Sequence, residues 1–511
     1  MEKIKKNKRP GSKALLITLI VVISVIAVGA TAVIGLYYYK KSGFKGTSGQ
    51  CTWSLDESGV LMISGSGSLE KELKVTRGLG EPALDSVTEI VFGEGVTSIP
   101  ESFTADMPNV TKVTIPSTVS TIGLYNFTEL KNLSEITVSP ENLVYTSENG
   151  DLYDKNMTEL IAYASGKPDI EYALPEGVSK IDINAFKYSA NLVKIDLNIA
   201  FTVLEDFAFV NCDALSEITV PEENGVFRSV DGDLYNFAEN RLFRYCPGKA
   251  DSVYQMPETV KRVEAGAFQG AANLTDITLS SHLTRIGIAG FYGCSGLTSV
   301  ELPETVEYVC ESAFAQCSSL TAVSLPAQQT IIPKDIFRGC TSLQYVELSD
   351  GITEIGSGAF SCSGIQTVII PDSVRTVGDN AFGGCASLES VYLPAGLTQI
   401  GDYTFNKCSV LKEITIPESV TSIGYSAFRG CIALNTVAVP DSVTAIGDYA
   451  FYGCTGLASA NIGSGVGSVG SGVFYGCDAL TGIAYNGTAE KWASVTVGTD
   501  NKVLTDKLSF K

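Results

Sequence analysis

Histidine is almost absent from this chain of 511 residues, in which His282 is the only one. A metal site built from several imidazole ligands is therefore excluded. A Ser–His or Cys–His catalytic pair would have to use His282, which we place in an exposed turn. We expect no catalytic role for this residue.

Charged residues are also scarce, at 18% of the chain against roughly 25% in an average globular domain. The formal net charge is −20. Removing the +5 of residues 1–13 and the +2 of Lys40 and Lys41 leaves −27 for the chain from Ser42 onward. A body this acidic has no overall electrostatic reason to bind nucleic acid or anionic lipid. We interpret its many carboxylates as solvated surface groups, although paired carboxylates are the one catalytic arrangement left open.

Long, strongly apolar runs are missing except at the N-terminus, where residues 14–36 are apolar or small and carry no charge. Twenty-three apolar or small residues can cross ~30 Å of hydrocarbon as a helix. Six Lys or Arg side chains precede this run and three soon follow it, which predicts a cytoplasmic tail at 1–13, a single-pass signal-anchor helix at 14–36 and an extracellular body. A cleaved signal peptide, ending near Ala30–Thr31–Ala32, remains the alternative. Residues 37–50 are then a linker.

Self-similarity is the strongest pattern in the remainder of the chain. Most repeat units are 23 residues long, one is 22, and two carry an insertion of 36 residues. The units begin at residues 87, 110, 133, 192, 215, 274, 297, 320, 343, 365, 388, 411, 434, 457 and 480. We therefore predict a solenoid over 87–479, preceded by an N-terminal β cap at 51–86 and followed by a C-terminal cap at 480–511.

Each recurring position within the repeat unit has a structural interpretation. The segment Leu411–K–E–Ile414–T–Ile416 alternates with period two, which predicts a short strand with positions 3 and 5 facing outward. Proline follows the strand and ends it at a corner. Glycine, as at Gly424, suits a second corner that we expect to need a positive φ. The phenylalanines should stack as an internal ladder; they are Phe127, Phe209, Phe291, Phe314, Phe337, Phe360, Phe382, Phe405, Phe428, Phe451 and Phe474.

The two insertions, near 140–175 and 222–257, resemble each other. Asn149–Gly150 and Asp231–Gly232 lie between apolar alternations and predict tight hairpins. We interpret the insertions as paired hairpin protrusions. Asp231–Gly–Asp233 superficially suggests calcium, but the rest of an EF-hand loop does not follow.

Thirteen cysteines raise the question of disulfides or metal. Ten of them share one slot of the unit, and a slot repeated along a solenoid gives a row, not a tetrahedral cluster. We expect buried thiols that act as small packing residues, with scattered disulfides as the alternative. The ten are Cys212, Cys294, Cys317, Cys340, Cys362, Cys385, Cys408, Cys431, Cys454 and Cys477.

A string that matches the dinucleotide fingerprint occurs at Gly465–V–Gly467–S–V–Gly470. No βαβ context surrounds it, and Gly470 occupies the ordinary glycine slot of the repeat. We predict no cofactor and no metal.

The unit L-x-x-I-x-I-P-x-S-V-x-x-I-G-x-x-A-F-x-G-C closely resembles the BspA-like leucine-rich repeat of bacterial surface proteins. Three further segments are similar to that family: the N-terminal segment Trp53–Gly67, the G-D-L-Y insertions and the tail Tyr485–N–Gly487–Thr488 to Trp492. The resemblance covers residues 51–511. It implies a leucine-rich-repeat solenoid of parallel strands joined by short helical or irregular turns, displayed at the cell surface and often used in adhesion. It supplies no catalytic residues.

Outward strand positions are the natural place for a binding surface, because stacked strands present a broad face. Most of these positions hold small polar or charged residues, but Tyr345, Ile369 and Tyr392 lie on three consecutive units and form a possible partner-binding patch. Chance scatter is the alternative. Tyr153 and Tyr235 in the insertions are comparable candidates, unless they pack within their own hairpins.

The sequence thus predicts a non-catalytic, adhesin-like protein that binds a protein or glycan ligand on a host or neighbouring cell, and not nucleic acid. A structural spacer without a specific ligand is the alternative. A targeting module of an envelope enzyme is a weaker one, because no segment is left over for catalysis. The sequence leaves the oligomeric state open.

Overall fold

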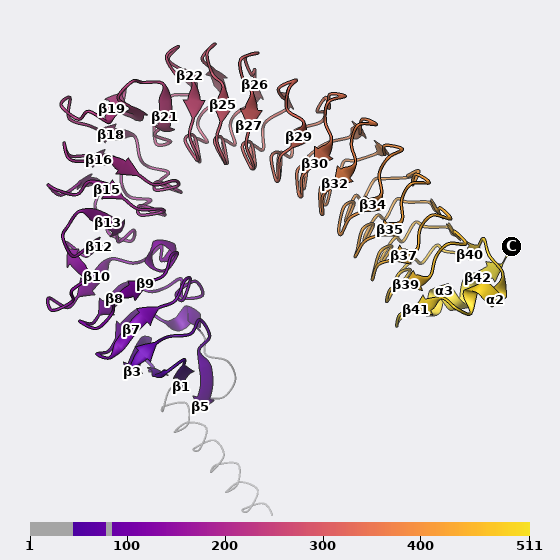
Figure 1. Ribbon diagram of the computed structural model, residues 1–511, viewed down its shortest axis with the longest axis horizontal. Helices are drawn as coiled ribbons and strands as arrows, with labels where there is room; N and C mark the ends of the chain where they lie inside the picture. The colour runs from indigo at the N-terminus through magenta and orange to yellow at the C-terminus, as the bar shows by residue number, and fades with distance from the viewer. Residues whose placement is uncertain (1–43, 78–83, 511) are drawn as a thin grey trace, which may run out of the picture. The chain divides into compact units, whose positions relative to one another are not determined.

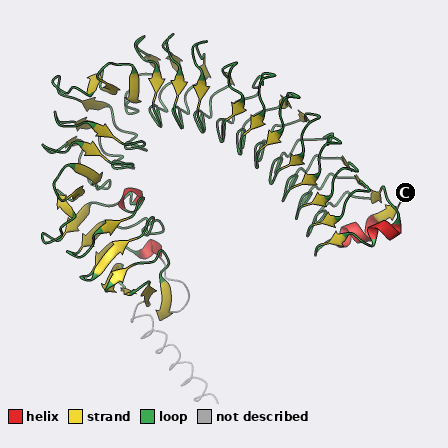
Figure 2. Cartoon of the chain, viewed as in Figure 1, coloured by secondary structure: helices red, strands yellow, loops and turns green. Residues whose placement is uncertain are grey.

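The computed structural model describes residues 44–77 and 84–510. The described part of the chain folds as a parallel β solenoid, in which each 23-residue unit forms one rung (Figures 1 and 2). The chain divides into two compact units, Met1–Lys167 and Pro168–Lys511. Within the described residues, no helix is both long and apolar enough to cross a bilayer. The tail predicted at 1–13 and the anchor predicted at 14–36 lie outside them.

The first unit begins with a cap of antiparallel strands. Strands β1 (Phe44–Ser48), β2 (Cys51–Leu55) and β3 (Val60–Gly65) form a meander, and β5 (Lys74–Arg77) pairs with the free edge of β1. The cap therefore starts inside the stretch predicted as a linker at 37–50. That prediction was wrong for 44–48, because Phe44–Ser48 gains a full set of partners along Cys51–Leu55.

Two parallel ladders grow from this cap. Strand β3 pairs in parallel with the first rung, so the cap also serves as the template for the stack. The first ladder continues through β6 (Glu89–Phe92), β8 (Lys112–Ile115) and β10 (Glu135–Val138). The second ladder, after the corner of each rung, contains β4 (Gly67–Ser68), β7 (Val96–Ile99) and β9 (Thr121–Ile122).

The second unit repeats this arrangement over many rungs. Partners in neighbouring strands are usually 23 residues apart, as in Thr436↔Ser459 and Ala445↔Ser468. First-ladder strands are β14 (Glu171–Ala173), β16 (Lys194–Asp196), β18 (Glu217–Thr219), β22 (Val253–Gln255), β24 (Asp276–Thr278), β26 (Ser299–Val300), β28 (Ala322–Val323), β31 (Thr367–Ile369), β33 (Ser390–Tyr392), β36 (Thr436–Val439), β38 (Ser459–Ile462) and β40 (Gly482–Tyr485).

The second ladder of this unit consists of shorter strands. They are β15 (Lys180–Ile181), β17 (Val203–Leu204), β21 (Arg241–Arg244), β23 (Arg262–Val263), β25 (Arg285–Ile286), β27 (Tyr308–Val309), β29 (Ile331–Ile332), β30 (Glu354–Ile355), β32 (Thr376–Val377), β34 (Gln399–Ile400), β35 (Ser422–Ile423), β37 (Ala445–Ile446) and β39 (Ser468–Val469).

The C-terminal segment extends both ladders by one more strand. Strand β41 (Thr496–Val497) pairs with β39, and β42 (Leu508–Phe510) pairs with β40. Helices α2 (Ala489–Trp492) and α3 (Lys502–Lys507) connect these strands, and the Trp492 ring packs on Tyr485 with centroids 4.9 Å apart. Apart from the single-turn 3₁₀ segments η1 (Leu84–Ser86) and η2 (Phe127–Glu129), the rungs of the described chain contain no helix. Their corners are turns, as predicted.

The predicted phenylalanine ladder is confirmed from Phe291 to Phe474, and Phe268 extends it by one ring, whereas Phe209 stacks on Phe186. From Phe268 to Phe474 the rings stack continuously, with neighbouring centroids 4.7–6.1 Å apart. Each ring along this run is at most 1% exposed. Because no single rung can cover its own phenylalanine, the aromatic core exists only in the stack.

The explanation predicted for the glycine slot was wrong. Gly424 and its equivalents do not have a positive φ. Instead, a Cβ atom on Gly424 would lie 2.7 Å from the backbone nitrogen of Asp402 in the preceding rung, and one on Gly470 would lie 2.4 Å from that of Asp448. The left-handed conformation occurs two residues later, as at Ser426 (φ 51°). At Gly424 and Gly470 the preceding rung lies too close for a Cβ atom, whereas other rungs hold a side chain in this slot, such as Glu264 and Cys310.

The insertions do not protrude as predicted. Each forms three antiparallel strands: β11 (Tyr145–Glu148), β12 (Asp151–Asp154) and β13 (Glu159–Ala162) in the first, and β19 (Phe227–Val230), β20 (Asp233–Asn236) and β21 in the second. The predicted turns at 149–150 and 231–232 are present. However, the turn carbonyls of Gly150 and Gly232 accept hydrogen bonds from Ile136 and Ile218 of the preceding first-ladder strands, and β21 joins the second ladder in parallel. The insertions are part of the solenoid wall.

Candidate ligand-binding surfaces

Ile369 and Tyr392 lie side by side on the first ladder. They are direct partners in the parallel pair β31–β33, and they are 62% and 61% exposed. The alternation that places Val368 and Val391 in the core forces the next residue of each strand outward. Two large apolar side chains therefore form one exposed patch, which we call the Ile369–Tyr392 pair.

Equivalent positions on successive strands form a column, and Tyr345 belongs to the column next to that of the pair, on the same face. It is 57% exposed, as predicted for an outward position. It precedes the buried residue Val346 of its rung, whereas Ile369 and Tyr392 follow Val368 and Val391. Glu347, and not Tyr345, occupies the column of the pair in that rung. The structure thus brings two of the three predicted residues into register and sets the third one column away.

The insertion tyrosines are not surface residues. Tyr153 and Tyr235 are each 1% exposed, so they pack within the insertions. In the first insertion the Asp151 carboxylate lies 2.8 Å from Lys167 Nζ and accepts the backbone N–H of Ala164. The G-D-L-Y sequence shared by both insertions therefore has a structural role: its aspartate forms a buried ion pair that fixes the end of the hairpin.

The second insertion has the same device. Asp233 lies 2.6 Å from Lys249 Nζ and accepts the backbone N–H of Cys246. Burial nevertheless raises the pKa of Asp233 to about 6, and the nearby charge of Lys249 only partly opposes this shift. The Asp233 carboxylate is thus already bound to Lys249 and Cys246, so Asp231 and Asp233 are not both available to bind calcium.

A pocket that the sequence did not predict opens beside the second insertion. Its volume is about 540 Å³, which lies within the range of small-ligand sites. Tyr235 Oη and Tyr254 Oη, 2.5 Å apart, lie on its wall, and Asp231 and Asp251 line it as well. Tyr254 comes from the following rung, so only the stacking of the chain assembles this pocket.

Nine cysteines of the predicted row are buried and hydrogen-bonded across rungs. Each Sγ lies 3.0–3.3 Å from the carbonyl oxygen of a phenylalanine in the preceding rung, as Cys340 does from Phe314. Cys362 was wrongly assigned to this row: counted from Phe360 it takes the slot of Gly339 and Gly384, and the residue that its rung lacks lies after it. It is exposed, with φ 57°, and Ser363 takes the buried slot beside Cys385.

His282 lies at an exposed corner, where its Nδ1 is 3.5 Å from a carboxylate oxygen of Glu258. Both side chains are more than half exposed, so this contact contributes little to stability. Within residues 44–77 and 84–510, no three His, Cys, Asp or Glu side chains are grouped as metal ligands would be.

The sequence matches a known family model over most of its length. The model describes the BspA type leucine-rich repeat region, and six copies match residues 83–165, 170–231, 261–389 and 375–495. Among curated proteins, none matches this chain significantly.

Several solved structures are similar. A leucine-rich repeat protein from Eubacterium ventriosum is 26% identical, with 75% of this chain and 93% of that chain covered and a TM-score of 0.43. A leucine-rich cell surface protein from Faecalibacterium prausnitzii is 18% identical, with coverages of 88% and 97% and a TM-score of 0.33. A leucine-rich repeat protein from T. pallidum is 28% identical, with coverages of 42% and 90% and a TM-score of 0.28.

Proposed function

Because this chain belongs to the family of BspA type leucine-rich repeat proteins, we propose that it is a non-catalytic, adhesin-like protein that binds a protein or glycan partner outside the cell. The Ile369–Tyr392 pair carries this proposal. Adjacent large side chains that are more than half exposed offer apolar surface for a partner to cover, and tyrosine is enriched among residues that dominate binding.

The first ladder supports this assignment by its rigidity. Val368 and Val391 anchor the two strands in the core, and a hydrogen bond of 3.2 Å joins the hydroxyls of Thr367 and Ser390 beside the pair. The two exposed side chains are held on short strands that pair with each other in register. A partner would therefore meet a preformed surface, which lowers the entropy cost of binding.

The N-terminal anchor and the extracellular placement of the body are part of the same proposal. The uncharged run at 14–36 and the excess of cations before it support them. Protease added to intact cells should degrade the body while an N-terminal epitope tag stays protected. Degradation of the tag, or protection of the body, would contradict this topology.

Binding can be tested with the purified full-length chain. We expect it to bind at least one member of a panel of cells, matrix proteins and glycans. The double variant Ile369→Ser/Tyr392→Ser should weaken that binding at least tenfold, whereas Ile432→Ser/Tyr475→Ser, which removes an Ile and a Tyr that are 51% and 53% exposed elsewhere, should not. Failure of the wild type to bind any member would favour a structural spacer. Equal binding by both variants would show that the partner contacts another surface.

A further inference from the structure

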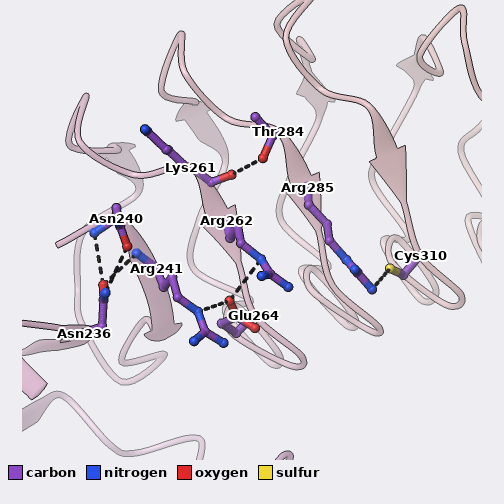
Figure 3. A network of polar contacts seen from close by, with 9 residues as sticks. All are labelled: Asn236, Asn240, Arg241, Lys261, Arg262, Glu264, Thr284, Arg285 and Cys310. Carbon is purple, nitrogen blue, oxygen red and sulfur yellow. Dashed lines mark hydrogen bonds and ion pairs between the residues drawn. The ribbon is translucent and has the colours of Figure 1, made fainter. Parts of the chain in front are cut away.

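Arginine is concentrated in one part of the chain. The ten arginines are Arg9, Arg77, Arg228, Arg241, Arg244, Arg262, Arg285, Arg338, Arg375 and Arg429, so five of them fall within residues 228–285. Three of these five share one column of the second ladder. Arg241 pairs with Arg262, and Arg262 pairs with Arg285, in parallel register on consecutive strands (Figure 3). We call these three residues the arginine column.

The arginine column contains more positive charge than the protein neutralises by contact. A single carboxylate oxygen, Oε1 of Glu264, lies 2.7 Å from Arg241 Nε and 3.5 Å from Arg262 Nε. Among the residues that the structure describes, Arg285 contacts no carboxylate: its Nη2 donates to Cys310 Sγ at 3.4 Å, and its guanidinium lies 6.0 Å from the centre of the Tyr308 ring. The terminal nitrogens of Arg241 and Arg262 point away from Glu264 (Figure 3).

The fold does not require arginine at these positions. Other strands of the second ladder have Thr376, Ser422 and Ser468 in the same column. Neighbouring strands are only ~4.8 Å apart, and like charges directly opposite each other destabilise a sheet. Three consecutive arginines therefore repel one another, and the charge of Glu264, with that of Asp206 near Arg241, offsets only part of this repulsion.

We propose that the arginine column is a binding site for an anionic polysaccharide, whose carboxylate or sulfate groups pair with Arg241, Arg262 and Arg285 as the sugar chain crosses the strands. Guanidinium groups bind such anions through paired N–H donors. The side chains of Arg241 and Arg262 are 40% and 42% exposed, and Arg285 is exposed as well. The site rests on the proposal that this is a binding protein, but it uses a different ladder from the Ile369–Tyr392 pair.

The spacing of the column favours a glycan over an acidic peptide. An extended peptide presents side chains on one face every ~6.8 Å, so it would fall out of step with strands ~4.8 Å apart by about 4 Å over the column. A polyuronate or sulfated glycan can carry an anionic group on every ring. Tyr308, 44% exposed, continues the column on the next strand and offers an aromatic face for a sugar ring.

The acidic character of the whole body does not oppose this site. Exposed charges further away than a Debye length of ~8 Å are largely screened at physiological ionic strength. Within residues 226–290, seven Lys or Arg side chains balance seven Asp or Glu side chains. The arginine column is thus a local exception in a body of charge −27, which also argues against binding of a long nucleic acid.

The test is titration of the full-length chain with four polymers: polygalacturonate, chondroitin sulfate, neutral dextran and poly-L-glutamate. We expect saturable binding to polygalacturonate or chondroitin sulfate, weakening as salt rises, and none to dextran. Binding to the first alone identifies a carboxylate ligand, and binding to the second alone identifies sulfate. No binding to either, or equal binding to poly-L-glutamate, would overturn the proposal.

Variants locate the site. Arg241→Gln/Arg262→Gln/Arg285→Gln should lower affinity for the glycan by on the order of 10–100-fold, while Arg338→Gln/Arg375→Gln/Arg429→Gln, with the same change in net charge, should stay within about twofold of the wild type. Equal affinity of the two triple variants would refute the site. If the first variant unfolds because Glu264 loses its partners, the glycan affinity of the single variant Arg285→Gln tests the site, since Arg285 does not contact that carboxylate. This single variant should also bind the glycan more weakly than the wild type.

A separate variant distinguishes this proposal from the previous one. Ile369→Ser/Tyr392→Ser should keep the affinity of the wild type for the anionic glycan, since the pair lies on the other ladder. Loss of glycan binding in that variant would place the glycan on the first ladder and not on the arginine column.

Discussion

The Sγ atom of Cys431 lies 3.1 Å from the carbonyl oxygen of Phe405, which precedes it by twenty-six residues and belongs to the previous rung. The same bond recurs along the row of buried cysteines. The thiol therefore fills a small slot and also satisfies a buried carbonyl group of the phenylalanine ladder. This contact explains why cysteine, and not alanine, suits the slot.

Burial should make these thiols unreactive. It raises the pKa of Cys431 and Cys385 to about 12, so their thiolate fraction at pH 8 is on the order of one in ten thousand. Iodoacetamide should label exposed Cys362 in the native protein and all thirteen cysteines after denaturation. Mass spectrometry of the labelled peptides measures this. Native labelling of Cys431 as fast as that of Cys362 would disprove the packing of the row.

Gly424→Ala should destabilise the second unit by about 1–3 kcal/mol, because its Cβ atom would lie 2.7 Å from the backbone of Asp402. Gly482→Ala is the matched control, since its Cβ atom would meet nothing within 4 Å. That variant should be neutral or slightly more stable. Urea denaturation compares the two. A neutral Gly424→Ala would mean that the rungs can separate at little cost.

Lys407→Gly should stabilise the protein by up to about 1 kcal/mol, because Lys407 has φ 59° and left-handed backbone is unfavourable for residues with a Cβ atom. Gly430 and Gly453 occupy the same slot in the next two rungs. Lys412→Gly, at a position outside the left-handed region, should instead destabilise. The midpoint of urea unfolding reports both effects. A destabilised Lys407→Gly would show that the lysine side chain contributes more than the strain costs.

Asp233 should make stability fall as pH rises from about 4 to about 6. Burial raises its folded pKa to about 6 from an ordinary value of 3.8, so the folded state holds the proton more tightly than the unfolded state in this window. The stability advantage is complete below the unfolded pKa and is lost as pH passes the folded pKa. Relative to Asp233→Asn, the wild type should lose about 1–3 kcal/mol of unfolding free energy across this window.

Asp56 supplies a comparison of opposite sign for that experiment. Hydrogen bonds from Ser58 and Val60 lower its pKa, so the wild type should lose stability relative to Asp56→Asn as pH falls. Denaturation of the three proteins between pH 3 and pH 7 measures both trends. If the Asp233 difference instead grows with pH, attraction to Lys249 outweighs the burial of the carboxyl group.

Much of the fold follows from local spacing in the sequence. The alternation around Ile414 correctly predicts that Ile414 and Ile416 are buried, but the strand predicted at Leu411–Ile416 was wrong, because these residues form no strand. The recurrence of Phe428 every 23 residues gives the aromatic core, and Asn149–Gly150 gives a hairpin turn. Each of these depends on neighbours within one rung or on a fixed period, and both are visible in the chain itself. The exposure of Ile369 and Tyr392 follows from the same alternation.

The tertiary structure decided what depends on contact between rungs. Gly424 lies against Asp402 of the preceding rung, which leaves no room for a Cβ atom. Cys362 is exposed because it takes the slot of Gly339 and Gly384. Arg241 joins the column because a folded insertion delivers its strand there. Gly424 and Asp402 are separated by 22 residues, and Arg241 and Arg262 by 21, so these neighbours meet only when the register of the stack is fixed. Sequence period predicts that rungs stack, but packing between backbones sets which side chains face each other.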